Sequence, residues 1–416
     1  MSGRSNAAPG DSRAAPLRNP GFRRLLGYRI FTILSYQIVA VTVGWEIYAR
    51  TGDPWMLGLV GLAEVLPYFC VAPFAGYLVD QLPRRKLGMA AATGLAITPL
   101  LLAMLALGVF EGSIWLIYLP IMLTGMVRAF LGPVYNALFA RVLPREQFVR
   151  GASLGSIAFQ GAVVVGPAIG GFVVGWSNTA TAYLLASALA LVVIAFLARM
   201  QVTEPAPQLQ RAPIFASIAE GGRFVFGHQM LLAALALDMF AVLFGGAISL
   251  APAFIHDILQ YGPEGLGILR GAPALGSVAM GIWLARNPIQ RNAGRILLFA
   301  VAGFGLCMIG FGLSTAFWLS AVFLLLSGMC DGISVVMRST IMQLSTPDHM
   351  RGRVSSINGL FVGSSNEIGA FYMGSMARLL GLVPAVVIGG FVTMGVVATT
   401  AWRAPRLRRL DLRDLQ

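Results

Sequence analysis

Long apolar stretches, separated by short polar or basic loops, recur along the whole chain. Each is on the order of 20 residues long, enough for an α-helix to cross a hydrocarbon core about 30 Å thick. They are too uniformly apolar for membrane β-strands, in which apolar and polar residues alternate. The pattern predicts an all-α integral membrane protein with twelve transmembrane helices. The predicted spans are 24–48, 55–79, 87–110, 114–140, 152–176, 180–200, 229–254, 265–285, 296–313, 316–342, 354–377 and 382–402.

Basic residues are divided very unevenly between the two sides of these spans. Of the 30 Arg and Lys residues, 24 lie in the tails and alternate loops, only Arg50 and Arg378 lie in the other loops, and four lie inside spans. Because cytoplasmic loops carry the excess of Arg and Lys, both termini are predicted to be cytoplasmic. The predicted organisation is a cytoplasmic tail over 1–22, a six-helix bundle over 23–200, a cytoplasmic linker over 201–228, a second six-helix bundle over 229–402 and a cytoplasmic tail over 403–416.

Composition supports a membrane protein and argues against several other classes. Apolar residues make up 57% of the chain and charged residues only 11%, against about 25% charged in soluble domains. The net charge of +13 is spread between apolar stretches and not along one face, so no nucleic-acid partner is expected. The three Cys and three His residues lack metal-ligand spacing, and the sequence has no phosphate-binding loop. We therefore expect no metal, no cofactor and no enzymatic activity.

The two halves of the chain carry short repeated segments. An offset of 205 relates 76–86 to 281–291, in which a Gly, a Pro and a final basic residue recur. An offset of 203 relates 124–128 to 327–331, each with a Gly-Met pair at the same place. Two like halves with inner loops in register are typical of transporters built from parallel repeats.

Three motifs lie in the first half, at the inner end of span two, in span four and in span five. The first runs from Gly76 to Lys86 and includes Asp80, Arg84 and Arg85; the second is Arg128 followed by Gly132; the third contains Gly166, Pro167, Gly170 and Gly171. They resemble the glycine–aspartate–basic loop, the proton-coupling arginine motif and the antiporter motif of the major facilitator superfamily. The resemblance covers nearly the whole chain.

This resemblance implies the major facilitator fold, with two pseudo-symmetric six-helix bundles. Segments 44–52 and 346–354 further resemble the drug:proton antiporter branch, which contains the enterobactin exporter and macrolide efflux proteins. The implied function is proton-coupled efflux of a small organic molecule, a drug or a siderophore, by a monomer in the bacterial inner membrane. An importer or facilitator of a small polar nutrient on the same fold is the alternative, since a fold does not determine function.

Five ionisable side chains inside spans form the predicted central-cavity and proton-coupling set. They are Arg128, Asp331, Glu367, Asp238 and Glu64. A charge inside the membrane is costly unless it is paired or hydrated. The repeat places Arg128 and Asp331 at matched depths, so we expect them to share the central cavity, either in coupling or as a static pair. Asp331 and Glu367 are the favoured proton carriers, because a carboxylate in a poorly solvated cavity can exchange a proton near neutral pH. Simple ion pairing is favoured for Asp238 and Glu64.

The motif residues Gly76, Asp80, Arg84 and Arg85 are predicted to form a cytoplasmic gate. Asp80 is expected to contact either the basic turn or a helix N-terminus of the second half, whose partial positive charge favours an anion. The repeat has Ala285 in place of Asp80, so this latch is predicted on one side only.

The antiporter motif and three further charges complete the predictions. Pro167 is expected to bend the fifth span, and the neighbouring Gly pair to let another helix pack closely against it. Arg270 and Glu46 are expected near outer span ends, where they snorkel or gate. Arg338 is expected to anchor an inner end.

Overall fold

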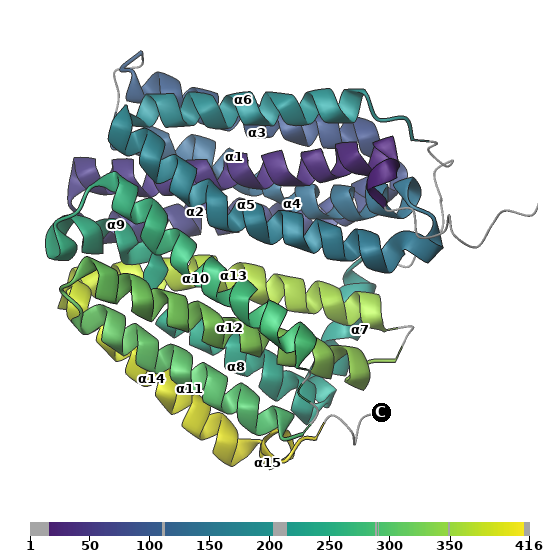
Figure 1. Ribbon diagram of the computed structural model, residues 1–416, viewed down its shortest axis with the longest axis vertical. Coiled ribbons are helices and arrows are strands. Elements are labelled where there is room, and N and C mark those ends of the chain that lie inside the picture. The colour runs from purple at the N-terminus through teal and green to yellow at the C-terminus, as the bar shows by residue number, and fades with distance from the viewer. Residues whose placement is uncertain are drawn as a thin grey trace, which may run out of the picture.

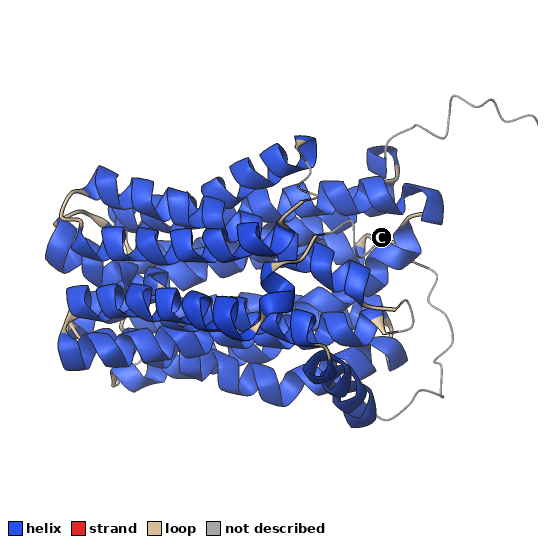
Figure 2. Ribbon diagram, turned by 90° about the horizontal axis from the view of Figure 1, so that it is seen from below, coloured by secondary structure: helices blue, strands red, loops and turns tan. Residues whose placement is uncertain are grey.

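The computed structural model is helical throughout the part of the chain that it describes. The described residues are 16–109, 113–202, 214–287, 289, 291–347 and 350–411. Within them, every regular element is a helix and no strand is present (Figure 2). The helices of the first half are α1 (Pro20–Thr51), α2 (Pro54–Gln81), α3 (Arg84–Ala106), α4 (Tyr118–Val142), α5 (Phe148–Trp176) and α6 (Thr179–Ala198). Short 3₁₀ helices precede α1, α4 and α5: η2 (Pro16–Arg18), η3 (Ile114–Ile117) and η4 (Arg145–Gln147).

The second half repeats this arrangement after a connecting helix, α7 (Ile214–Gly227), which packs against α8, α13 and α2. Its first span is broken into α8 (Gln229–Gly245), η5 (Ala247–Leu250), α9 (Ala251–Ala253) and the π-helix η6 (Phe254–Leu259). The remaining helices are α10 (Pro263–Arg286), α11 (Ala293–Leu313), α12 (Phe317–Ser345), α13 (Arg351–Leu380), α14 (Leu382–Arg403) and α15 (Pro405–Arg408).

Eleven of the twelve predicted spans fall in described helices that are long and apolar enough to cross a membrane. The span predicted over 354–377 lies in α13, which has 30 residues but falls outside that set. Polar residues such as Ser364, Asn366 and Glu367 lower its hydropathy. Because α13 packs between α2 and α8, it faces protein on two sides, and this explains how the fold accommodates its polarity.

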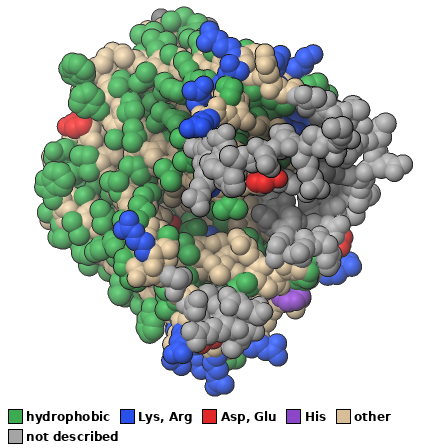
Figure 3. Space-filling model, turned by 45° about the vertical axis from the view of Figure 1, so that its right-hand side comes forward, with side chains coloured by type: hydrophobic (Ala, Val, Ile, Leu, Met, Phe, Trp, Pro, Cys, Tyr) green, Lys and Arg blue, Asp and Glu red, His purple; other side chains and the backbone are tan. Residues whose placement is uncertain are grey.

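The helices group into two bundles that meet along two helix pairs (Figure 1). α1–α6 pack mainly on one another, as do α8–α14. Between the bundles, α5 packs on α10 and α2 packs on α13. We call the end of the bundles with α7 and the loops before α3, α5 and α11 the basic end, and the end with the loops before α2, α6 and α10 the far end. In Figure 3, which turns the basic end forward, most exposed charged side chains are Lys or Arg.

The two halves are in close contact at the far end and separate toward the basic end. Three glycines of α13 trace this change. A Cβ added at Gly374 would lie 2.7 Å from the Pro54 carbonyl oxygen of α2, and one at Gly363 would meet nothing nearer than 3.9 Å. A Cβ at Gly359, nearest the basic end, would have nothing within 4 Å. The structure is therefore closed at the far end and open toward the basic end.

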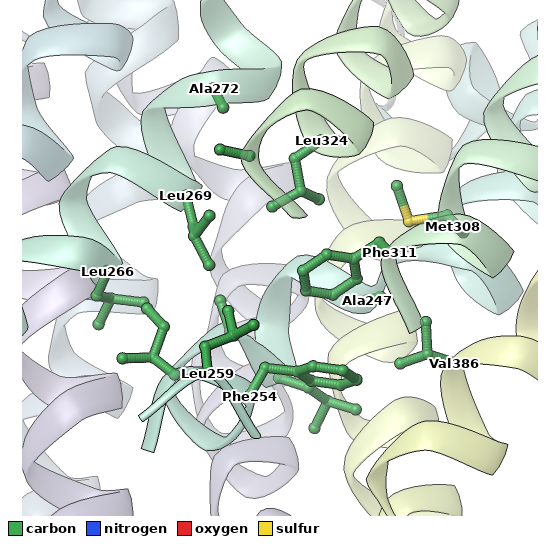
Figure 4. Close-up of a cluster of buried hydrophobic side chains, with 14 of the residues drawn as sticks. Ala247, Phe254, Leu259, Leu266, Leu269, Ala272, Met308, Phe311, Leu324 and Val386 are labelled. Atoms are coloured by element: carbon green, nitrogen blue, oxygen red, sulfur yellow. The ribbon is translucent and has the colours of Figure 1, made fainter. Parts of the chain in front are cut away.

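A buried apolar cluster supports the closed far end. The rings of Phe254 in η6 and Phe311 in α11 lie 4.7 Å apart, and Leu324 of α12 belongs to the same cluster (Figure 4). Val41 of α1 also joins it, so apolar packing continues from one half into the other. Because lipid tails are as apolar as these side chains, the cluster stabilises the contact mainly through van der Waals packing.

Candidate functional site

A charged cluster joins the two halves near the middle of the helices. Arg128 of α4 donates from Nη1 to the hydroxyl of Tyr36 in α1, at 2.8 Å, and to Oε1 of Glu367 in α13, at 3.0 Å. The same Nη1 forms an ion pair with Oε1 of Glu64 in α2. Together, Tyr36, Glu64, Arg128 and Glu367 form what we call the central cluster. It brings together three of the five predicted cavity residues.

Glycines explain how these helices come close enough for the central cluster to form. A Cβ added at Gly125 of α4 would collide with the carbonyl oxygen of Glu64, and one at Gly61 of α2 would lie 2.5 Å from the carbonyl oxygen of Glu367. Each glycine lies one turn before a charged member of the cluster on its own helix. Close backbone approach therefore places both carboxylates within reach of one guanidinium.

Arg270 of α10 supplies a second positive charge to this region. It lies within electrostatic range of Tyr36, Glu64 and Glu367. Its Nε atom is buried and has no hydrogen-bond partner among the described residues. Arg270 does not snorkel at an outer helix end, because its side chain turns inward toward the central cluster. Two guanidiniums thus balance two carboxylates there. A gating role for Arg270 stays a prediction.

Asp331 does not join Arg128 in this structure. It lines a small cavity within the second half, with room for about one water molecule. The lining residues are Asp238, Ala241, Val242, Val301, Phe304, Cys330, Asp331 and Ser334. The predicted pairing with Arg128 fails because equal depth along two helices does not determine which way each residue faces. α12 turns Asp331 toward its own half.

Asp238 and Arg338 form a second buried ion pair beside that cavity. Oδ2 of Asp238 in α8 pairs with Nη1 of Arg338 in α12, and both residues are 6% exposed. The Ser334 hydroxyl donates to Oδ1 of Asp238 at 3.5 Å. The structure thus shows the ion pairing favoured for Asp238. Arg338 is not the inner-end anchor that we expected, because it is buried between helices.

The antiporter motif lies where α5 contacts both halves. Cβ atoms added at Gly166 and Gly170 would meet α1, whereas one at Gly171 would lie 2.7 Å from the backbone nitrogen of Gly267 in α10. The carbonyl oxygen of Pro167 lies 2.6 Å from a Cβ built on Gly267. The close helix packing predicted for this motif is therefore present, and its partners are α1 and α10.

The predicted cytoplasmic gate is only partly described. Asp80 lies in the last turn of α2, but its side chain lies outside the described part of the structure. Arg84 begins α3, and Nη1 of Arg85 donates to the carbonyl oxygen of Met200 at 3.0 Å, which ties α3 to the end of α6. A Cβ at Gly76 would meet nothing within 4 Å. The latch involving Asp80 stays a prediction.

Polar contacts at the far end also join the two halves. The Tyr48 hydroxyl of α1 donates to Oδ2 of Asp257 in η6 at 2.5 Å. Arg378 of α13 lies 3.4 Å from Asp53, which caps α2. Glu46, expected to snorkel or gate, is instead buried and accepts from the Tyr183 hydroxyl of α6 at 2.6 Å. The first two contacts depend on residues far apart in the chain, so no local pattern reveals them.

The fold of two helical bundles, together with a family model that matches nearly the whole chain, identifies a membrane transporter of the major facilitator superfamily. Residues 11–416 match the model of a family described as transmembrane secretion effector, and the chain belongs to that family.

Curated relatives and solved structures agree with this assignment. An enterobactin exporter, EntS, of Shigella boydii serotype 18 is 26% identical over 382 residues, which cover 90% of this chain and 89% of the relative. EntS of Escherichia coli O157:H7 is 25% identical with the same coverage. A bacterial homologue of the human lysosomal transporter Spinster, in an inward-facing and unoccupied conformation, superposes with a TM-score of 0.74 at 14% identity, covering 96% of this chain and 98% of that one. A POT family transporter in complex with 5-aminolevulinic acid gives 0.73 at 12% identity, with 93% and 96% covered.

Proposed function

We propose that the protein exports a small organic molecule, a drug or a siderophore, in exchange for protons by alternating access. The central cluster carries this proposal, because one guanidinium, Arg128, holds a carboxylate from each half. Glu64 comes from the first half and Glu367 from the second. The relatives named as enterobactin exporters support export as the direction. We further propose that the protein works as a monomer in the bacterial inner membrane, with both termini cytoplasmic.

The central cluster offers a physical route from protonation to movement of the halves. When Glu367 is ionised, its bond to Arg128 is charge-assisted and holds the halves together. A proton on Glu367 removes the carboxylate charge, so the ion pair becomes a weaker hydrogen bond between the guanidinium and a neutral carboxyl group. A substrate that reaches Arg128 competes for the same contacts. Proton and substrate therefore act on the same contact between the halves, and exchange requires that they use it in turn and not together.

Export from cells tests this proposal. Bacteria with and without the protein would be loaded with a fluorescent amphiphilic drug or a radiolabelled catecholate siderophore, and loss of label followed over time. We expect faster loss of at least one compound when the protein is present, and no acceleration after a protonophore is added. Acceleration that persists with the protonophore would contradict proton coupling. Increased retention of label would favour the importer alternative.

A further inference from the structure

The helices α1 and α4 contain two layers of stacked arginine and tyrosine. α1 carries Arg29 and Tyr36, α4 carries Arg128 and Tyr135, and in both helices the two residues are seven positions apart. The Arg128 guanidinium carbon lies 4.6 Å from the ring centroid of Tyr36, and that of Arg29 lies 4.0 Å from the ring centroid of Tyr135. Seven residues are two helical turns, so the layers are about 10 Å apart.

The two layers differ in how their arginines are neutralised. Arg128 is paired with Glu64 and Glu367. Arg29 forms no ion pair with any carboxylate of the described residues, and its Nε is buried without a hydrogen-bond partner. A guanidinium inside a transmembrane helix is costly without a counter-charge. An anion bound beside Arg29 would supply the charge that Glu64 and Glu367 supply to Arg128.

The second layer lies on the route between the basic end and the central cluster. Arg29 and Tyr135 are each two turns nearer the basic end than the central-cluster residue of the same helix. Gly132 lies between Arg128 and Tyr135 on the same face of α4, and a Cβ there would meet nothing within 4 Å. The ring of Phe159 in α5 lies 5.0 Å from the Arg29 guanidinium. We call Arg29, Tyr135 and Phe159 the vestibule layer.

We propose that the vestibule layer binds the carboxylate of an aromatic carboxylic acid. A guanidinium presents two parallel N–H donors that match a carboxylate. Phe159, which is partly exposed, offers a ring surface for the aromatic part of the same molecule, whereas the buried Tyr135 ring holds the Arg29 guanidinium in place. As an entry point for exported substrate this assignment rests on the proposed function, whereas the binding itself does not. A bound carboxylate would next meet Arg128, where it competes with Glu367.

Binding of defined probes to the purified full-length protein tests the vestibule layer. Equilibrium dialysis in nanodiscs of neutral phosphatidylcholine would compare radiolabelled 2-naphthoate, 2-naphthylmethylammonium and cyclohexanecarboxylate. We expect 2-naphthoate to bind about 10-fold or more tightly than either of the others. Arg29→Gln should weaken 2-naphthoate binding about 10-fold or more, and Arg29→Lys should weaken it less, because the charge remains and the fork is lost.

Arg23→Gln is the matched control, because Arg23 is an exposed arginine of the same helix outside the layer. We expect it to change 2-naphthoate binding less than 2-fold. Equal losses for Arg23→Gln and Arg29→Gln, or no loss for Arg29→Gln, would overturn the proposal. If Arg29→Gln does not fold, Phe159→Leu tests the same proposal. It should abolish the preference for 2-naphthoate over cyclohexanecarboxylate. An unchanged preference would contradict the proposed site. Binding requires no gradient, so missing efflux would contradict the proposed function alone.

Discussion

At the scale of single residues, the Asp238–Arg338 pair illustrates how strongly buried charges depend on each other. Both side chains are buried between α8 and α12. Asp238→Asn would leave the Arg338 charge without a counter-ion, which typically costs about 3–5 kcal/mol. We expect a clearly lower melting temperature for this variant in detergent.

The double variant Asp238→Leu/Arg338→Met should recover most of that loss, because an apolar pair often replaces a buried ion pair at little cost. A melting temperature unchanged by Asp238→Asn would contradict the buried pair. So would a double variant that is less stable than the single one.

The sequence identified the embedded charges but not all of their partners. Apolar surroundings mark Arg128, Glu64 and Glu367 as candidates, and the structure brings these three together. Asp331 has the same depth as Arg128 but faces elsewhere. Depth follows from position along a span, whereas the direction a side chain faces depends on how each helix is rotated against its neighbours. Neither hydropathy nor the internal repeat determines that rotation.

At the scale of helices, contact between α5 and α10 depends on the absence of side chains. A methyl group at Gly171 would lie 2.6 Å from the carbonyl oxygen of Pro263 and 2.7 Å from the nitrogen of Gly267. Gly171→Ala should therefore force α5 and α10 apart at the far end. We expect increased labelling by a membrane-impermeant maleimide at a single cysteine placed in α10 near Gly267, together with slower transport.

Gly161→Ala is the matched control, because it adds the same methyl group to α5 where nothing lies within 4 Å. It should leave both labelling and transport near the level of the unsubstituted glycine. Equal labelling in the two alanine variants would argue against a role for this glycine contact in closing the far end.

Most of the helices could be predicted from the length of the apolar stretches in the sequence. In α13 this signal is weaker. The span predicted over 354–377 lies in this helix and contains polar residues such as Asn366 and Glu367. A helix that lines the interface between two halves exposes less surface to lipid, so it can carry polar residues that a lipid-facing helix cannot. The broken span at η6 had no comparable signal, because local hydropathy does not distinguish a π-helix from an α-helix.

At the scale of the whole molecule, the halves touch at the far end and separate toward the basic end. Alternating access requires the far-end contacts to break. In a variant without native cysteines, Tyr48→Cys/Asp257→Cys would place thiols on both sides of one such contact. Cross-linking them with a short dimaleimide should stop transport, and treated single-cysteine variants should retain it. Full transport by the cross-linked double variant would contradict opening at the far end.

Transport in proteoliposomes shows whether Glu367 couples proton movement to substrate movement. Protein with Glu367 intact should accumulate an exported compound against its concentration gradient when a pH gradient is imposed. Glu367→Gln should still exchange labelled for unlabelled compound at equilibrium but lose pH-driven accumulation, because it cannot carry the proton. Glu146→Gln, which changes an exposed carboxylate, should behave like the unsubstituted protein. Accumulation by Glu367→Gln at the unsubstituted protein's rate would show that Glu367 does not carry the coupled proton.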